Sequence, residues 1–404
     1  MNITSVQLKN FRNITFCELQ PSEGINFFVG QNAQGKTSLL EALVYLSYLK
    51  SFRNSKLEEV IQKNSKKAQI ICELKKEKKN EAENINSYRT KLSCQIEMNE
   101  TGQAKRFFMA NDKPIKSSLK FLEERQNYPE KGFYAVVFHP GDHDLIRSVP
   151  SFRRGYFDRI LGTQSEFYLN ALKSYQKALQ QRNAILKNFI FSRSTSLLED
   201  FSEQLAIYGT KMLLYRRQWM EKFIPHVNRI ICSITSEAFS LTIEEENKIG
   251  DQSSCPQVIH NKIKEILLKN KEKDRSVGWT TGGPHRSDWS FQLNERSLKG
   301  YGSQGEIRAT LLALKLAEIE LYQKDFSDNP VLFLDDFSSE LDQKKREYLL
   351  DYIADKKLQA FITTTEFKPI KGQQYWVKNG HFEMKESSVS KIEKTNKFKE
   401  TAFF

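Results

Sequence analysis

Short, uninterrupted apolar runs alternate along this chain with longer segments in which apolar residues recur every three or four positions. Residues 25–29, 133–138 and 331–334 form the short runs, and each has the length of a buried β-strand. Residues 39–49 and 311–319 have the spacing of a helix. Buried strands followed by helices predict an α/β fold.

Two further segments, residues 168–186 and 201–219, carry large residues at alternating intervals of four and three. This spacing predicts two helices, each with a narrow apolar seam, packed antiparallel through a loop near residues 191–196. The aromatic residues of the seams are expected to belong to a core.

The junction between the first predicted strand and the helix after it has the spacing G-x-x-x-x-G-K-[ST], which is typical of a phosphate-binding loop. Gly30 and Gly35 free the backbone to wrap a phosphate chain, and the helix N-terminus adds partial positive charge. Lys36 is expected to reach the β- and γ-phosphates and to serve catalysis, and Thr37 to ligate Mg²⁺. The predicted ATP-binding residues of this loop are Gly30, Gln31, Asn32, Ala33, Gln34, Gly35, Lys36, Thr37 and Ser38.

The strand predicted at residues 331–334 ends in two aspartates. A buried strand that delivers a carboxylate beside a phosphate loop is a common source of the Mg²⁺ ligand, so Asp335 is the second predicted metal ligand. Asp336 is the predicted catalytic residue, which would orient or deprotonate the attacking water.

A Ser-Gln-Gly turn opens the helix predicted after residue 303, and it has two interpretations. Ser303 and Glu306 form a Ser-x-x-Glu capping box, which requires no ligand. The same turn would also suit an anion at the helix N-terminus, with Ser303, Gln304, Gly305 and Glu306 as nucleotide-binding residues. Taken with the phosphate loop before it and Asp335 after it, the turn matches the signature motif of ABC-type ATPases, in which two heads sandwich two nucleotides.

Several segments together resemble the RecF family of bacterial DNA repair proteins, and the resemblance runs from about residue 1 to about residue 384. The segments that carry it are residues 8–13, 30–37, 50–53, 175–183, 283–288, 334–342 and 363–365. Two departures limit what can be transferred. Gly141 stands where the family usually has the Glu of a Pro-Glu-Asp stretch, and Ser287 replaces an acidic residue.

The resemblance implies an ABC-type P-loop ATPase head with an inserted α-helical lobe. Residues 1–150 and 275–384 would form the ATPase lobe and residues 151–274 the helical lobe. Residues 385–404 lie beyond the resemblance, and their composition, rich in Lys, Ser, Glu and Thr with almost no apolar periodicity, predicts a disordered tail. The resemblance further implies an ATP-dependent homodimer with slow, DNA-stimulated ATPase activity. The family partners would be gapped DNA with single- and double-stranded parts, RecR and RecO, and indirectly RecA, in gap repair, replication restart and the SOS response.

Charge agrees with a polyanionic partner, because 62 basic residues outnumber 50 acidic ones and give a net charge of +12. No base-reading motif is visible, so phosphate contacts are expected to dominate. It stays open whether the helical lobe is a plain bundle or an arm that faces DNA. Its candidate phosphate contacts are Arg153, Arg154, Arg159, Lys173, Lys177, Arg182, Arg216 and Arg217.

The cysteines and histidines indicate neither a disulfide framework nor a catalytic or metal site. The five cysteines are scattered and show no paired spacing, so most are expected to be small buried residues, and His285 is expected to be structural. No apolar run is long enough to cross a bilayer, which favours the cytoplasm. The terminal Phe403 and Phe404 offer an anchor for a partner, although fraying is the simpler expectation.

Three alternatives remain. An SMC-like ATPase head would need a longer coiled-coil insertion than this chain has. An ABC transporter ATPase subunit would usually carry a switch histidine where this chain has Thr364 and Thr365. A family member that binds ATP without hydrolysing it is disfavoured by the intact Lys36, Thr37, Ser303, Asp335 and Asp336.

Overall fold

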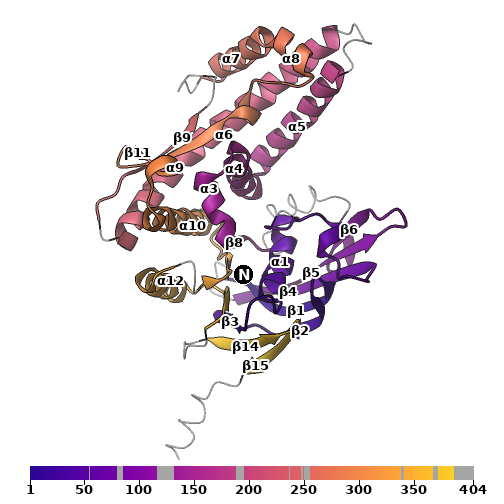
Figure 1. The fold of residues 1–404 in the computed structure, drawn as a ribbon, viewed down its shortest axis with the longest axis vertical. Helices are drawn as coiled ribbons and strands as arrows, with labels where there is room; N and C mark the ends of the chain where they lie inside the picture. Colours follow the sequence, from indigo (N-terminus) through magenta and orange to yellow (C-terminus); the bar gives the residue numbers. More distant parts are fainter. Residues whose placement is uncertain are drawn as a thin grey trace, which may run out of the picture. The chain divides into compact units, whose positions relative to one another are not determined.

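The computed structural model describes residues 1–53, 55–79, 85–115, 132–187, 195–235, 237–246, 249, 255–337, 341–366 and 372–385 (Figure 1). The chain forms two compact units. The first comprises Met1–Pro140 and Phe326–Phe404, and the second comprises Gly141–Asp325. The predicted tail, apart from Lys385, lies outside the described residues, and so do residues 191–194 of the loop predicted near residues 191–196. Residues 195 and 196 of that loop belong to the helix that begins at Thr195.

The first unit contains a six-stranded sheet in the order β15-β14-β3-β13-β12-β8. Its strands pair in parallel except for the edge strand β15, which pairs antiparallel with β14. The three apolar runs of the sequence supply β3, β8 and β12, as predicted. The bounds are β3 (Ile25–Val29), β8 (Ala135–Phe138), β12 (Val331–Leu334), β13 (Ala360–Thr364), β14 (Gln373–Lys378) and β15 (His381–Lys385).

A second, antiparallel sheet completes the first unit in the order β2-β1-β4-β5-β6-β7. The bounds are β1 (Asn2–Phe11), β2 (Ile14–Leu19), β4 (Lys67–Lys79), β5 (Ile85–Met98), β6 (Ala104–Ala110) and β7 (Lys113–Ile115). Helix α1 (Lys36–Tyr48) contacts strands of both sheets, including β4, β5, β8 and β13. Because both sheets cover it, α1 is buried almost all round.

Two further helices belong to the first unit. The short helix η1 (Glu58–Val60) follows α1, and α12 (Gln343–Asp355) is capped by the Asp342 carboxylate, which accepts from the Lys345 backbone N–H. Cys17, Cys72 and Cys94 are buried as predicted, whereas the two cysteines of the second unit are half-buried and exposed.

The second unit is mainly helical, with a small sheet in the order β11-β10-β9. Its helices are α3 (Asp144–Arg147), α4 (Pro150–Gln164), α5 (Glu166–Lys187), α6 (Thr195–Thr235), α7 (Pro256–Lys269), α8 (Lys271–Val277), α9 (Leu298–Tyr301) and α10 (Gln304–Phe326). The short helices η3 (Pro140–His143) and η4 (Pro284–Arg286) and the strands β9 (Leu241–Glu246), β10 (Asp288–Leu293) and β11 (Arg296–Ser297) connect them.

Helices α5 and α6 pack antiparallel, which confirms the pair predicted from the seams. Arg182, late in α5, donates from Nε to Ser202 Oγ at 3.0 Å, and Arg216 in α6 donates from Nε to the hydroxyl of Tyr168 at 2.8 Å. Helix α6 is longer than the 201–219 segment because its seam continues through Phe223 and beyond, and these residues are also buried.

Three of the eight predicted phosphate contacts are wrong, because Arg153, Arg182 and Arg216 are buried in ion pairs. Their guanidinium groups pair with Asp288, Asp274 and Asp158 at 2.6, 2.8 and 2.7 Å respectively. A buried guanidinium requires a carboxylate and further hydrogen bonds to offset the loss of water. These arginines are therefore committed to the core of the second unit.

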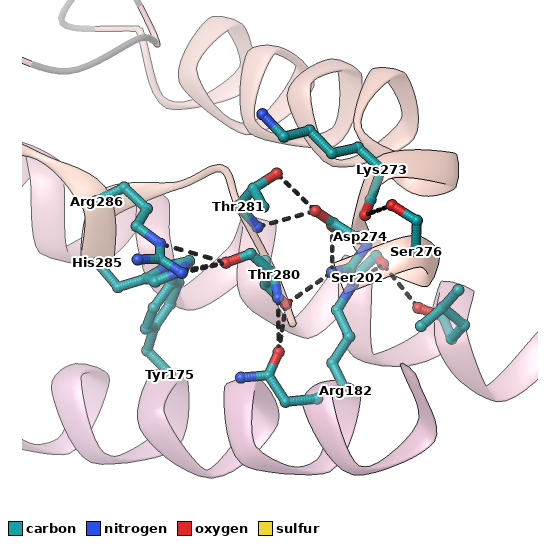
Figure 2. A network of polar contacts seen from close by, with 12 residues as sticks. Tyr175, Arg182, Ser202, Lys273, Asp274, Ser276, Thr280, Thr281, His285 and Arg286 are labelled. Carbon is teal, nitrogen blue, oxygen red and sulfur yellow. Dashed lines mark hydrogen bonds and ion pairs between the residues drawn. The ribbon is translucent and has the colours of Figure 1, made fainter. Parts of the chain in front are cut away.

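Figure 2 shows the network around Arg182 and the segment before β10. The Thr280 hydroxyl accepts from Arg182 Nη1 at 2.7 Å, and the Thr280 carbonyl accepts from Arg286 and from His285 Nε2. Burial lowers the pKa of His285 to about 4, so the ring is neutral at pH 7, and its Nδ1 accepts from the Tyr175 hydroxyl at 2.7 Å. His285 thus links α5 to the Thr280 turn, which agrees with the structural role expected of it.

Candidate functional site

The phosphate loop joins β3 to α1 in the first unit, and its shape depends on two glycines. A Cβ on Gly30 would lie 2.3 Å from the Val377 carbonyl oxygen of β14, so only glycine fits there. Gly35 has a φ of 112°, a backbone conformation that other residues rarely adopt. The sequence places glycine at both positions for these two different reasons.

Lys36 turns its side chain back onto this loop. Its Nζ donates to the carbonyl oxygens of Gly30 and Gln31, the second at 2.8 Å. Burial lowers the pKa of Lys36, while the charges of Asp336 and Asp335 oppose the shift. Carbonyl oxygens are weak partners for a buried ammonium, and phosphate oxygens in the loop would be stronger ones.

Thr37, Asp335 and Thr363 meet beside Lys36, although they lie far apart in the sequence. Thr37 Oγ1 and Thr363 Oγ1 both donate to Asp335 Oδ1 at 2.8 Å. Burial raises the pKa of Asp335, and the two hydroxyl groups act against that rise. The Thr363 hydroxyl also accepts from the Asp336 backbone N–H at 2.8 Å, which holds the two aspartates in their turn.

A pocket of about 770 Å³ opens over these residues, entirely within the first unit. It is lined by nine of the eleven residues predicted from the loop and the two aspartates, together with residues that the sequence analysis did not name as site residues. The complete lining is Arg12, Asn13, Asn32, Ala33, Gln34, Gly35, Lys36, Thr37, Ser38, Arg53, Glu59, Ile61, Lys63, Pro140, Asp335, Asp336 and Thr363. Gly30 and Gln31 belong to the loop but not to this lining.

Glu41 is the residue that organises the second wall of the pocket. Its side chain is fully buried on α1, and both of its oxygens pair with Arg12, at 2.7 Å to Nη2 and 3.0 Å to Nε. It also accepts from the Ser51 hydroxyl and lies 3.7 Å from Arg53 Nη1. Two of the segments that resemble the RecF family, 8–13 and 50–53, therefore share one carboxylate. Only the tertiary contact reveals this, because Glu41 itself looks like any helical glutamate.

The turn between β14 and β15 supports the outer side of the phosphate loop. The Gly380 backbone N–H donates to the Gln34 carbonyl at 2.8 Å, and the Asn379 N–H donates to Gln34 Oε1 at 2.7 Å. Asn13 also holds the loop, because its Nδ2 donates to the Ala33 carbonyl and its Oδ1 accepts from the Ser38 hydroxyl. The phosphate loop is thus supported by both the β14–β15 turn and Asn13.

The predicted signature residues lie in the second unit, where the capping-box interpretation is confirmed. The Ser303 backbone N–H donates to Glu306 Oε2 at 2.7 Å, and the Glu306 N–H donates to Ser303 Oγ at 3.2 Å. The hydrogen bond from the Ser303 backbone N–H lowers the pKa of the Glu306 carboxyl. Ser303, Gln304 and Gly305 are exposed at the start of α10. Their role toward a nucleotide stays a prediction.

Comparison with known proteins connects this site to a family. The family model for the RecF/RecN/SMC N-terminal domain matches residues 2–386. The chain belongs to the RecF family. The DNA replication and repair protein RecF of Thermoanaerobacter sp. is 33% identical over 385 residues, which is 94% of this chain and 99% of that protein. RecF of Staphylococcus haemolyticus is 34% identical over 370 residues, which is 90% of this chain and 93% of that protein.

Solved structures agree with this family. The recombination mediator protein RecF with ATP, in the RecFOR pathway, matches with a TM-score of 0.83 and 29% identity, over 95% of this chain and 97% of that one. The Smc head domain from Pyrococcus furiosus matches with a TM-score of 0.54 and 16% identity, over 99% of each chain, which shows a shared fold. The predicted α/β fold of an ABC-type ATPase head with an inserted helical lobe is confirmed. As a RecF family member, the chain is a DNA replication and repair protein.

None of the described helices is both long enough and apolar enough to span a bilayer. The cytoplasmic location expected from the sequence stays a prediction.

Proposed function

We propose that this RecF family member binds ATP in the pocket of its first unit and uses ATP to control its grip on DNA in recombinational gap repair. The observation that carries the proposal is the contact of Thr37 with Asp335 at 2.8 Å, directly beside Lys36 and the phosphate loop. These three side chains come from two distant segments, and each has the chemistry that a magnesium nucleotide needs.

The phosphate chain would be held by the backbone of residues 30–38, with Lys36 exchanging its carbonyl partners for phosphate oxygens. Thr37 and Asp335 fit Mg²⁺, since they offer a hydroxyl and a carboxylate oxygen, the ligand types that this ion takes beside nucleotide phosphates. Mg²⁺ held there would neutralise charge on the phosphate oxygens. Thr363 would keep Asp335 and Asp336 in position through its hydroxyl.

The second part of the proposal is an ATP-dependent homodimer. Ser303, Gln304, Gly305 and Glu306 of one subunit would close over the nucleotide of the other. The capping box is compatible with this role, because the Ser303 hydroxyl accepts in the cap and still has its own proton to donate. The backbone N–H groups of a first helical turn have no partner within the helix and suit an anion.

Hydrolysis would end the dimer. Asp336 would orient the attacking water, and loss of the γ-phosphate would remove the contact that bridges the two subunits. We expect weak ATPase activity, stimulated by DNA, because the site acts as a timing switch. In this scheme residues 1–150 and 275–384 work as the ATPase lobe, and residues 151–274 as the helical lobe.

The nucleic-acid partner would be gapped DNA, gripped mainly through phosphates by the basic surface of the dimer. Arg154, Arg159, Lys173, Lys177 and Arg217 remain as candidates in the helical lobe. The solved relatives are described as recombination mediators in the RecFOR pathway, which supports RecR and RecO as protein partners and RecA as the protein finally loaded.

Sedimentation of the purified chain with and without ATP, Mg²⁺ and gapped DNA tests the proposal. We expect a dimer that requires ATP and that is lost in Lys36→Met and in Ser303→Arg. Lys269→Met and Ser276→Arg, both at exposed positions of the second unit, are the matched controls and should dimerise normally. A monomer under every condition would refute the switch, and dimers that form without ATP would separate dimerisation from the nucleotide.

A further inference from the structure

Glu41 is a buried charged residue beside the nucleotide pocket that the proposed function leaves without a role. Its side chain is fully buried on α1, about one helical turn after Thr37, and it is not among the residues that line the pocket. It therefore does not meet a nucleotide itself. Burying a carboxylate is costly unless cations and hydrogen-bond donors satisfy it, so the role of Glu41 lies in the partners that it holds.

Arg12 is the first of these partners, and the fold uses most of its donors. Besides both oxygens of Glu41, its guanidinium contacts the Glu59 carbonyl at 2.7 Å and the Ser55 hydroxyl. These contacts use four of the five N–H groups of a guanidinium. Arg12 also has a φ of 55°, a left-handed conformation that costs free energy in residues other than glycine. Glu41 and its neighbours thus fix the turn between β1 and β2, and they leave Arg12 little to offer a ligand.

Arg53 is the second partner, and its guanidinium is far less satisfied. Its side chain is 49% exposed and lines the nucleotide pocket. Within the described part of the chain it has one charged partner, Glu41, whose Oε2 lies 3.7 Å from Arg53 Nη1, too far for a hydrogen bond. Ser51 is buried between the two residues in the chain of contacts: its hydroxyl donates to Glu41 Oε1 at 2.5 Å and accepts from the Arg53 backbone N–H at 3.0 Å. Glu41 therefore constrains both the backbone and the side chain of Arg53.

We propose that Glu41 is a positioning residue for ATP, which holds Arg53 through its carboxylate and through Ser51 so that the guanidinium contacts phosphate oxygens in the pocket. The inference rests on the proposed function, since it needs ATP in that pocket. A phosphate oxygen at hydrogen-bond distance is a stronger partner for Arg53 than a carboxylate 3.7 Å away. Because Glu41 constrains the guanidinium before ATP arrives, less side-chain entropy is lost on binding.

The test is a double-mutant cycle on the full-length chain, with the affinity for a fluorescent ATP analogue as the measurement. Arg53→Gln and Glu41→Gln should each weaken binding about tenfold, the effect of losing one hydrogen bond to a charged group. The double variant should also lose about tenfold rather than about 100-fold, because both changes remove the same contact. Glu18→Gln and Arg89→Gln, at exposed positions of β2 and β5 outside the pocket, are the matched controls and should bind normally.

Salt dependence separates positioning from a purely structural role. With one cation fewer facing the phosphates, the affinity of Glu41→Gln should fall less steeply with added salt than that of the unaltered chain. A loosened fold would weaken binding without changing this slope. Urea unfolding shows whether Glu41→Gln is folded, and Ser51→Ala is the milder variant if it is not. Ser51→Ala should share the flatter slope and the coupling to Arg53.

The outcomes distinguish this inference from the proposed function. Additive losses in the double variant, or an unchanged salt slope in both Glu41→Gln and Ser51→Ala, would overturn the role of Glu41. If ATP binding is still lost in Lys36→Met, those results leave the proposed function intact. Normal ATP binding by Lys36→Met, or no binding by the unaltered chain, would overturn the proposed function and this inference with it.

Discussion

Lys36 in the first unit and Arg182 in the second are both buried cations, but their partners differ in kind. Lys36 donates to two backbone carbonyl oxygens and has a pKa lowered by burial. Arg182 pairs with the buried carboxylate of Asp274 and with the hydroxyls of Thr280 and Ser202. A cation fully satisfied by its own fold serves stability, whereas a cation left with weak partners beside a pocket is suited to a ligand.

The largest effect in this comparison is expected from Arg182→Leu. It leaves the Asp274 carboxylate buried without its charge partner, so the free energy of unfolding should fall by about 3–5 kcal/mol. Urea unfolding measures this loss. Lys177→Leu, at an exposed position of the same helix, is the control and should change stability little. If both variants unfold alike, the buried pair does not hold the second unit together.

Lys36→Met should show the opposite behaviour, with binding lost and stability kept. Losing two charge-assisted hydrogen bonds to phosphate should weaken ATP binding about 100-fold. The free energy of unfolding should not fall, because a lysine whose pKa is lowered by burial is replaced by an apolar side chain. Titration with a fluorescent ATP analogue and urea unfolding provide the two readings. A destabilised variant with normal ATP affinity would reverse the roles assigned to Lys36 and Arg182.

His285 predicts how the second unit responds to acid. Its pKa is about 4 in the folded chain and near 6.5 when exposed, so below pH 6.5 the unfolded chain binds a proton that the folded chain does not. The contribution of His285 is therefore complete above pH 6.5 and decreases as the pH falls toward 4. At pH 5 this loss should be about 2 kcal/mol relative to pH 7. Urea unfolding of the unaltered chain and of His285→Asn at both pH values isolates it, and identical pH dependence in the two would contradict a buried neutral histidine.

Substitutions of Ser303 should change stability least. They also separate two roles of one residue, because Ser303 caps α10 and is proposed to contact the nucleotide. Ser303→Ala removes the cap of α10 and should cost about 1 kcal/mol, whereas Ser303→Gly should cost only a few tenths. Thermal or urea unfolding measures both. Sedimentation with ATP then tells whether each variant still dimerises. Weakened dimers in Ser303→Gly, whose helix is nearly as stable, would support contact with the nucleotide, and normal dimers in both would limit Ser303 to the cap.

Prediction from the sequence was accurate where a feature depends on neighbouring residues. The phosphate loop, the strand before it and the helix after it depend on glycine, apolar and lysine positions within about twenty residues. The capping box of Ser303 and Glu306 is local too, and its two interpretations were both visible. The long α5–α6 pair was predicted from its seam, although the end of α6 was missed because its seam continues past residue 219.

Prediction from the sequence failed for charged side chains that the fold buries beside distant partners. Arg182 looks like a DNA contact on a basic helix, and its partner Asp274 lies 92 residues away. The second wall of the nucleotide pocket was missed for the same reason, since Glu41 gathers Arg12 and Arg53 from separate segments. Thr363 was part of a family segment, but only the structure shows that its hydroxyl joins Asp335 to the Asp336 backbone.

The sequence by itself determined the chemistry available to this protein: a glycine-bounded phosphate loop, a paired carboxylate after a buried strand, a capped helix and an excess of basic residues. Only the tertiary structure decided which charged side chains line a pocket and which form ion pairs in the core. The physical reason is that backbone conformation and apolar spacing are local properties, whereas the cost of burying a charge is set by whichever partners the fold brings beside it.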